Sequence, residues 1–305
     1  MNGLFDEILR YLFPTYKNQV AVWKKIYPNL NAETDKFLES FRHAGIFWTN
    51  EKFINQTVKV TEIDVNHFFP SIIVNDELPK GISEDITAEF KEFHRCHKEY
   101  PFEHHYAYFI KAVINFDDIK LHYFPETNTP IFYETYEFSF CDCEIGILEK
   151  CYPGFRIVKV LQVLKFKTGY SPLKRFIEYY FSPYNFSETK EQRKIKKNNI
   201  NKFIGVLSKP QSVSRISFPA MVIYLWAMAK VKILSWFFYF EKSMVLLNTD
   251  ALVFRDKNNE IITALQKEGY ITDDIGNFKI KHQNEEIIIK NINSKIWLKD
   301  ITYRK

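Results

Sequence analysis

Two aspartates lie at the ends of apolar stretches that are typical of buried strands. Asp64 closes the stretch 58–65, and Asp250 lies between the apolar stretches 246–247 and 252–254. A charged residue at the end of a buried strand is costly unless it is paired or bound to a metal ion. Carboxylates from separate elements can hold the two divalent cations that phosphoryl transfer from a nucleoside triphosphate requires. Either aspartate alone is more typical of a turn or a helix cap, so the prediction depends on the residues around both.

A third stretch has the spacing of a basic helix. Lys197, Asn201 and Ile204 are spaced i, i+4 and i+7 and therefore share one helix face, which Arg193 and Lys190 continue toward the N-terminus. Such a face can bind a triphosphate at its basic end and contact a base pair at its apolar end. The alternative is a solvated basic face on a surface helix.

Composition indicates a folded protein with a large core. The chain has 305 residues, of which 46% are hydrophobic and 17% aromatic, and its net charge is +5. The local excess of lysine and arginine favours phosphate partners over a membrane surface. The apolar stretch 218–240 is long enough to span a bilayer, but Lys230 and Lys232 near its middle would each cost about 3 kcal/mol there. We therefore expect a buried helix and no membrane partner.

The cysteines indicate a reducing compartment. Four cysteines occur in a sequence without an N-terminal signal pattern, so we expect a cytoplasmic location, which is the host cytoplasm if a phage encodes the chain, and no disulfides. Cys141 and Cys143, with several histidines nearby, form a possible zinc site. No paired Cys-x2-Cys or His-x3-His spacing supports it.

The order of the patterns predicts an α+β fold. We expect a helical segment over residues 3–43, a hairpin-like piece over 47–58, and an antiparallel sheet region between 78 and 167. Strands are expected in that region at 119–124, 131–140 and 157–166. Helices are expected at 172–181, 188–207 and 219–241, and further strands at 244–254 and 286–298. This alternation indicates helices packed against a mostly antiparallel sheet.

Three motifs, in this order, resemble those of family B DNA polymerases, specifically the protein-primed branch of small phages and linear plasmids. They are DVNHFFPSI (64–72), KKNNINKFIGVLSKP (196–210) and LLNTDALVF (246–254). Segments 41–53, 163–180 and 294–300 are also similar to that family: they resemble the approach to the first motif, the approach to the fingers and the primer-gripping strand. Together the matches cover most of residues 20–300.

The resemblance implies a palm-and-fingers architecture and a role for each matching residue. Two Mg²⁺ or Mn²⁺ ions would be held by Asp64, Asp250 and the backbone carbonyl of Val65, with both aspartates catalytic. The nucleotide would be bound by Lys197 with Arg193 or Lys190, by Asn201, and by Phe69 as a steric gate against a ribose 2′-hydroxyl. Primer and DNA would be held by Thr249, Lys295 and Trp297.

The sequence also departs from the family pattern. Asn248 stands where the third motif usually has its first Asp, so one carboxylate near the metals is missing. Lys202 replaces a small hydroxyl residue, and Ile204 replaces the usual Tyr, which removes ring stacking near the templating base. We expect weaker metal affinity or an altered ion preference.

The expected organisation is a reduced right hand. Only 63 residues precede Asp64, too few for the family's exonuclease domain, so proofreading is not expected, and the eight residues after Trp297 leave no thumb. The predicted segments are 1–57 (N-terminal helical segment), 58–80 (palm), 81–170 (palm insertion, a candidate contact region for a priming protein), 171–207 (fingers) and 208–305 (palm).

The predicted function is a template-directed DNA polymerase without proofreading, with a protein among the candidate primers. Its partners would be primer-template DNA, dNTPs and a priming or accessory replication protein. One alternative is a catalytically degenerate, polymerase-like protein that binds nucleic acid or serves as a replication scaffold. Another is a primase or an untemplated nucleotidyl transferase.

Overall fold

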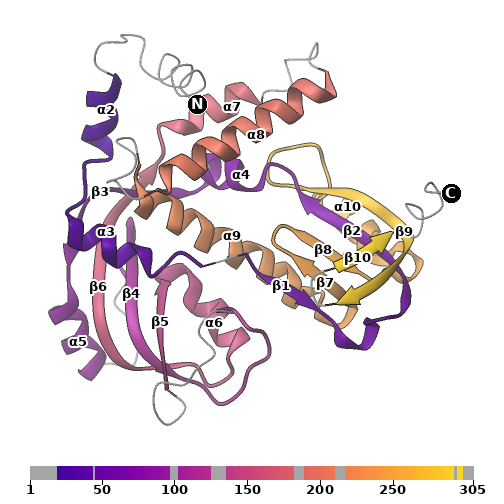
Figure 1. Ribbon diagram of the computed structural model, residues 1–305, viewed down its shortest axis with the longest axis horizontal. Coiled ribbons are helices and arrows are strands. Elements are labelled where there is room, and N and C mark those ends of the chain that lie inside the picture. Colours follow the sequence, from indigo (N-terminus) through magenta and orange to yellow (C-terminus); the bar gives the residue numbers. More distant parts are fainter. Residues whose placement is uncertain are drawn as a thin grey trace. The chain divides into compact units, whose positions relative to one another are not determined.

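The computed structural model describes residues 19–43, 45–96, 102–124, 135–181, 189–209, 217–291 and 294–297. They form an α+β fold with two antiparallel sheets and packed helices, which confirms the predicted class (Figure 1). The chain divides into two compact units. Unit 1 comprises residues 1–43 and 72–228, and unit 2 comprises residues 44–71 and 229–305. Two of the three boundaries fall inside helices, α4 (Phe68–Asn75) and α9 (Pro219–Tyr239). The finer division into five segments stays a prediction.

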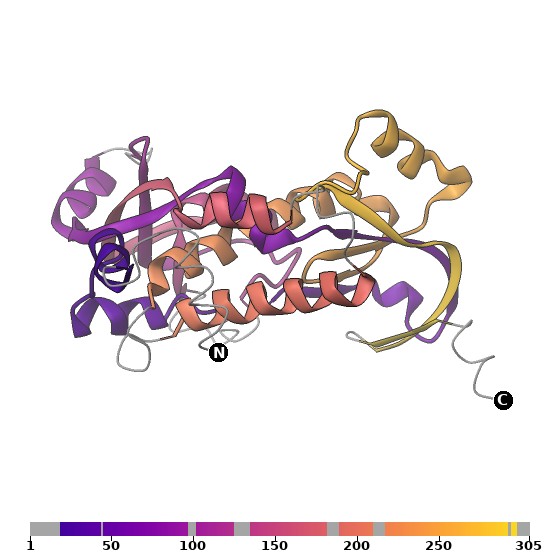
Figure 2. The same cartoon turned by 90° about the horizontal axis from the view of Figure 1, so that it is seen from above.

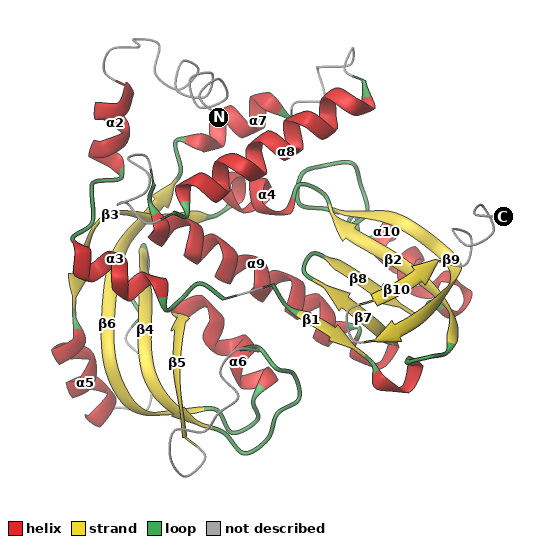
Figure 3. Ribbon diagram, viewed as in Figure 1, coloured by secondary structure: helices red, strands yellow, loops and turns green. Residues whose placement is uncertain are grey.

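Unit 2 is built on a six-stranded antiparallel sheet with the order β1-β7-β8-β2-β9-β10 (Figure 3). The strands are β1 (Phe47–Thr49), β2 (Thr57–Val65), β7 (Met244–Asn248), β8 (Ala251–Phe254), β9 (Phe278–Asn291) and β10 (Ser294–Trp297). The short helices are η2 (Glu51–Phe53), η4 (Glu241–Ser243), η5 (Lys257–Asn259) and α10 (Glu260–Lys267). Val58 and Val60 of β2 pack against Val245, Val253 and Ile287 of the neighbouring strands, so the sheet carries its own apolar core.

The pairing of β2 with β9 is irregular at two places. Val60 lies opposite Glu285 and Glu62 opposite His282, and the next pair is Ile63 with Ile280. At each shift β9 contributes one residue more than β2, which is the definition of a β-bulge. Bulges bend the strand that carries them, and β9 is strongly curved along its length (Figure 2).

Unit 1 contains a four-stranded antiparallel sheet with the order β3-β6-β4-β5. The strands are β3 (Glu77–Asp85), β4 (Tyr106–Asn115), β5 (Thr135–Cys141) and β6 (Arg156–Tyr170). The helices are α2 (Gln19–Ile26), α3 (Ala32–Glu39), α5 (Thr87–Cys96), η3 (Asp142–Glu144), α6 (Ile145–Cys151), α7 (Leu173–Tyr180) and α8 (Lys190–Leu207). Aromatic rings pack across the sheet and against the residue before α9: Phe166 of β6 packs edge-on against Phe109 of β4 and against Phe218, with ring centroids 5.3 Å and 6.2 Å away.

Two carboxyl groups follow β5, one buried and one half-buried. Glu144 is 2% exposed and accepts a hydrogen bond from the Tyr123 hydroxyl. Asp142 accepts the Tyr108 N–H at 2.9 Å and the Tyr224 hydroxyl at 3.5 Å. Burial raises the pKa of the Asp142 carboxyl to about 6, although these hydrogen bonds favour the charged form.

Most of the predicted elements are confirmed. The helices expected at 172–181, 188–207 and 219–241 are α7, α8 and α9. The strand expected over 58–65 is β2, and the stretch 244–254 is the β7–β8 hairpin. The stretch 286–298 falls on the end of β9 and on β10, and 157–166 lies within β6. The helical N-terminal segment is confirmed for α2 and α3, while residues 3–18 lie outside the described residues, as does the first part of the expected strand 131–140.

The strand expected over residues 119–124 is wrong. Its alternating apolar pattern resembles a strand, but its backbone groups bond elsewhere. The N–H groups of Tyr123 and Phe124 donate to the Tyr152 hydroxyl, and the N–H of Leu121 donates to the carbonyl of Cys151. The segment is therefore a loop with both exposed and buried side chains, and its N–H groups bond to the last residue of α6 and to the residue after it. The strand that was missed is β4, which lies just before it in the chain.

The long apolar stretch forms α9. Helix α9 is long enough and apolar enough to cross a membrane, and in the described part of the chain it is the one helix of which this is true. Side chains along it are buried within the protein, among them Met221, Leu225 and Leu234, each 0% exposed. This burial agrees with the predicted core helix.

The cysteines near β5 are enclosed. Cys141 and Cys151 are buried, and burial raises the pKa of the Cys143 thiol and that of Cys151, the latter to about 12. A raised pKa disfavours the thiolate, which is the form that binds zinc. Among the described residues, no group of three or more His, Cys, Asp or Glu side chains is arranged to hold a metal.

Asp142 should make stability depend on pH. Its pKa of about 6 in the folded protein exceeds the ordinary value near 3.9 in the unfolded chain. The folded state therefore keeps a proton that the unfolded state has lost, and this contribution is complete below about pH 4 and is lost as pH rises through 6. Relative to Asp142→Asn, we expect the wild-type free energy of unfolding to fall by about 2 to 3 kcal/mol between about pH 4 and pH 7. Urea denaturation across this range measures the difference, and parallel curves would contradict the assignment.

Candidate functional site

The end of β2 and the β7–β8 turn bring three predicted site residues together. Asp64 is the penultimate residue of β2 and pairs with Ala251 of β8. The Val65 N–H donates to the Asp250 carbonyl at 3.2 Å, so Asp250 follows directly along the same ladder. The three residues therefore lie at neighbouring strand ends within unit 2. Two carboxylates from separate elements must lie this way if they are to share a metal site.

The turn that carries Asp250 is tight and specifically supported. Thr249 has a φ of 52°, which is uncommon for a residue other than glycine, and its N–H donates to the Ile46 carbonyl at 2.9 Å. A Cβ on Gly45 would lie 2.8 Å from the Thr249 hydroxyl oxygen, so the chain before β1 can approach the turn only because residue 45 is a glycine. Thr249, predicted to contact the primer, is half-buried in this turn.

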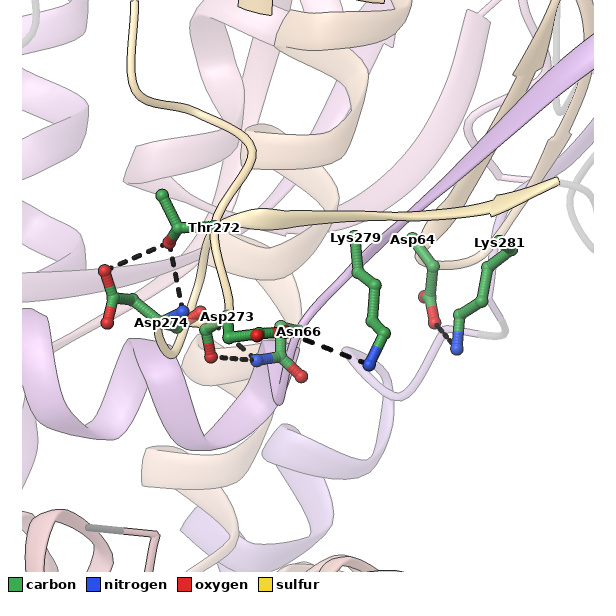
Figure 4. A network of polar contacts seen from close by, with 7 residues as sticks. All are labelled: Asp64, Asn66, Thr272, Asp273, Asp274, Lys279 and Lys281. Atoms are coloured by element: carbon green, nitrogen blue, oxygen red, sulfur yellow. Dashed lines mark hydrogen bonds and ion pairs between the residues drawn. The ribbon is translucent and has the colours of Figure 1, made fainter. Parts of the chain in front are cut away.

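The carboxylate of Asp64 is paired with a lysine that sequence reasoning missed. The Lys281 ammonium lies 2.9 Å from Oδ2 of Asp64, whose side chain is 14% exposed (Figure 4). Lys279 lies directly opposite Asp64 in the ladder but extends toward Asp273, 4.0 Å away. Lys279 and Lys281 are two residues apart, so the alternation of a strand puts both on one face. The strand that carries Asp64 lies more than two hundred residues earlier, and no local pattern in the sequence indicates that the two strands pair.

The chain that follows Asp64 is fixed by the turn before β9. The Asn66 side-chain amide donates to the carbonyls of Asp273 at 2.7 Å and Asp274 at 3.3 Å (Figure 4). The Asn66 carbonyl accepts the Gly276 N–H at 2.7 Å, and Thr272 holds the Asp274 carboxylate at 3.0 Å. These bonds position the backbone carbonyls next to Asp64, including that of Val65.

Phe69 lies in the first turn of α4. Its ring is half-buried and stacks beside Phe68, with ring centroids 6.0 Å apart. His67 precedes the helix with a φ of 50°, so the chain turns sharply between β2 and α4. Phe69 is therefore held five residues after Asp64 within unit 2, and its role as a steric gate stays a prediction.

The two predicted primer-gripping residues already make contacts within the sheet. Lys295 forms an ion pair with Glu62 in which the two side chains are 16% and 13% exposed. Trp297 is 9% exposed and stacks on His282 at a centroid distance of 3.7 Å. Glu62 and His282 were not identified from the sequence because the β2–β9–β10 pairing that brings them there is non-local.

Helix α8 lies in unit 1 and buries one face. Its core residues are Ile200, Phe203, Ile204 and Leu207, each at most 6% exposed. Lys197 is half-buried beside this face and Asn201 is exposed, whereas the side chains of Lys190 and Arg193 lie outside the described residues. The helix begins with a capping box between Thr189 and Gln192. The shared face predicted for residues 197, 201 and 204 therefore runs from solvent into the core.

The donor set at the strand ends fits a hard divalent cation. Asp64 and Asp250 offer carboxylate oxygens and Val65 a backbone carbonyl, which are the ligand types that Mg²⁺ and Mn²⁺ take. Asn248, at the end of β7, is exposed and uncharged, so the described part of this turn supplies one carboxylate, that of Asp250. With Lys281 beside Asp64, the formal charge of the two aspartates and this lysine is −1.

No family model matches the sequence. No curated protein matches it. Solved structures of Phi29 DNA polymerase are similar: an orthorhombic crystal form and a ternary complex with primer-template DNA and incoming nucleotide substrates each have a TM-score of 0.70, at 14% and 15% identity, and cover 95% of this chain and 54% of that chain. A complex with single-stranded DNA has a TM-score of 0.70 at 14% identity and covers 95% and 53%.

These matches show the fold. The chain has a polymerase-like α+β fold similar to that of Phi29 DNA polymerase, and it spans about half the length of those structures. Because the identity is low, the likeness concerns the arrangement of the backbone. Activity must be argued from this chain's own residues.

Restoring a carboxylate at position 248 should strengthen metal binding. Asn248→Asp adds a negative charge at the end of β7, next to the turn that carries Asp250, so we expect Mn²⁺ to bind about tenfold more tightly. Isothermal titration calorimetry measures the change. Gln283→Glu, which adds the same charge at an exposed position on β9, should change the affinity less than about twofold. Equal affinity of the Asn248→Asp variant and the wild type would place the ion elsewhere.

A tyrosine at position 204, the residue that the resemblance in sequence would place there, should destabilise unit 1. Ile204 is 3% exposed among the core residues of α8, so the larger ring of Ile204→Tyr overpacks the helix interface. We expect a loss of about 1 to 3 kcal/mol in the free energy of unfolding. Chemical denaturation checks this, with Lys202→Tyr at an exposed position of the same helix as the matched control. Equal stability of the two variants would show that position 204 has room for a ring.

Proposed function

We propose that the chain is a template-directed DNA polymerase that adds deoxynucleotides to a primer 3′-hydroxyl. The observation that carries the proposal is the position of Asp64 and Asp250 at neighbouring ends of β2 and the β7–β8 turn. The fold supports it, because similar solved structures are of Phi29 DNA polymerase, one of them complexed with primer-template DNA and incoming nucleotides. Primer-template DNA and dNTPs are the partners that this function requires.

The cofactor we propose is a pair of Mg²⁺ or Mn²⁺ ions. Asp64, Asp250 and the Val65 carbonyl would hold them, and the ions would activate the primer hydroxyl and neutralise the leaving pyrophosphate. The protein's own contribution is to hold these oxygens in place. The Asp250 carbonyl accepts the Val65 N–H, and Asn66 fixes the segment after Asp64 through its bonds to the turn before β9.

The roles of the remaining predicted residues rest on the motif resemblance and are part of the proposal. Lys197, half-buried beside the core face of α8, would bind the triphosphate, and Asn201, exposed on the next turn, would line the nucleotide site. Phe69 would stand beneath the sugar and exclude a 2′-hydroxyl. A protein primer and an accessory replication protein remain part of the proposal as partners.

A second candidate is a polymerase-like protein that binds nucleic acid without catalysis. Two observations favour it: Asn248 removes a carboxylate from the turn, and the Asp64 carboxylate is already paired with Lys281. This candidate predicts that dNTP with Mg²⁺ or Mn²⁺ leaves thermal stability unchanged. The enzyme binds both and gains stability by mass action, which raises the melting temperature.

Replacing Asp250 should abolish synthesis while leaving the fold intact. Asp250→Asn keeps the size of the side chain and its turn but removes the negative charge, so we expect template-matched primer extension to fall by about a hundredfold or more. Extension of a labelled primer with four dNTPs and Mg²⁺ or Mn²⁺ measures it.

The matched control is Asp273→Asn, whose side chain is 98% exposed on the turn before β9 and should leave extension unchanged. Retained extension by the Asp250→Asn variant would contradict the metal assignment. Extension that ignores the template would indicate an untemplated transferase. Loss of synthesis with an unchanged melting temperature is the expected pair of results.

A further inference from the structure

Lys281 owes its position to a bulge. The β2–β9 ladder pairs Glu62 with His282 and then Ile63 with Ile280, so Lys281 is the extra residue of β9 between these pairs. The extra residue of a bulge has no partner in the ladder, so Lys281 reaches Asp64 diagonally, while Lys279 occupies the position opposite that aspartate. The position of Lys281 therefore depends on the bulge and not on a pairing partner in β2.

The bulged lysine contacts one oxygen of Asp64. Its ammonium lies 2.9 Å from Oδ2, while its side chain stays 41% exposed. Asp64 is only 14% exposed, so its charge is partly removed from water and a nearby cation affects it more than it would at the surface. Figure 4 shows the Asp64 carboxylate between the two lysine side chains, with the ion pair drawn to Lys281.

A divalent cation held by Asp64 would compete with this ammonium. Because Mg²⁺ binds carboxylate oxygen at about 2.0 to 2.1 Å, an ion on Asp64 would lie within a few ångströms of a lysine that stayed on the same carboxylate. The two positive charges would repel each other, so either the ammonium would move away or the ion would bind more weakly. Because Lys281 is partly exposed, it can move into solvent without breaking the sheet.

We propose that Lys281 is a built-in counter-ion of the candidate metal site that competes with divalent cations for Asp64 and thereby lowers the affinity of the site for them. The inference rests on the proposed function, because it takes Asp64 as a metal ligand. It assigns a role to a residue outside the three motifs. The affinity of the site for divalent cations would then depend on β9 as well as on the two aspartates.

Removing the ammonium should therefore tighten metal binding. Mn²⁺ is titrated calorimetrically at constant ionic strength into the wild type, Lys281→Met and Lys281→Arg. We expect the Lys281→Met variant to bind Mn²⁺ about five- to tenfold more tightly, because one positive charge a few ångströms from a divalent ion is gone. Lys281→Arg keeps the charge and should stay within about twofold of the wild type.

Lys279→Met is the matched control. It removes the same charge from the same strand, at the residue opposite Asp64. Because Lys279 extends toward Asp273 and is 54% exposed, the Mn²⁺ affinity of this variant should differ from that of the wild type by less than about twofold. Asp64→Asn combined with Lys281→Met should lose the gain. Circular dichroism checks that each variant is folded.

The outcomes separate the inference from the proposed function. Equal or weaker Mn²⁺ binding by the Lys281→Met variant, with binding by the wild type that depends on Asp64, overturns the inference and leaves the polymerase proposal intact. The same holds if Lys279→Met gives an equal gain, because the effect is then not specific to the bulge. No Mn²⁺ binding by either the wild type or the Lys281→Met variant overturns both.

Discussion

The position of β2 between β8 and β9 is the constraint on which the candidate site depends. Ile63 is fully buried and Val65 nearly so, which fixes the face that each residue of this strand presents. A slip of one residue would bury Asp64 and expose Ile63, so the apolar neighbours of the aspartate hold it in register. Through β8 the strand meets the turn that carries Asp250, and through β9 it meets Lys281.

Local patterns in the sequence were sufficient to predict the elements that carry the chemistry. Asp64 and Asp250 interrupt apolar stretches, and those stretches are β2 and the β7–β8 hairpin. Local pattern failed where the backbone bonds to a side chain. The segment 119–124 alternates as a strand does, yet the Tyr152 hydroxyl accepts two of its N–H groups and keeps it out of a sheet. Periodicity measures which side chains are apolar and says nothing about such an acceptor.

The partners of the site residues were beyond prediction for a different reason. Lys281 with Asp64 and Lys295 with Glu62 each join residues more than two hundred positions apart, through a ladder with two register shifts. Without the bulges, counting along the two strands gives the wrong opposite residues. The helical spacing of α8 was predicted correctly, but the side of the helix that is buried was not. An apolar residue at position 204 could face either a base or the protein core. Its burial among core residues decides for the core.

Asn248 and Lys281 have the same electrostatic effect on this sheet. Carboxylates at neighbouring strand ends repel one another, and that repulsion opposes folding whenever no cation is bound. A neutral side chain at position 248 and an ammonium on Asp64 each reduce the repulsion, so the folded chain is easier to form. The same two features leave a divalent cation less negative charge to bind. Stability without metal and affinity for metal therefore oppose each other here, and the β9 bulge shifts the balance toward stability.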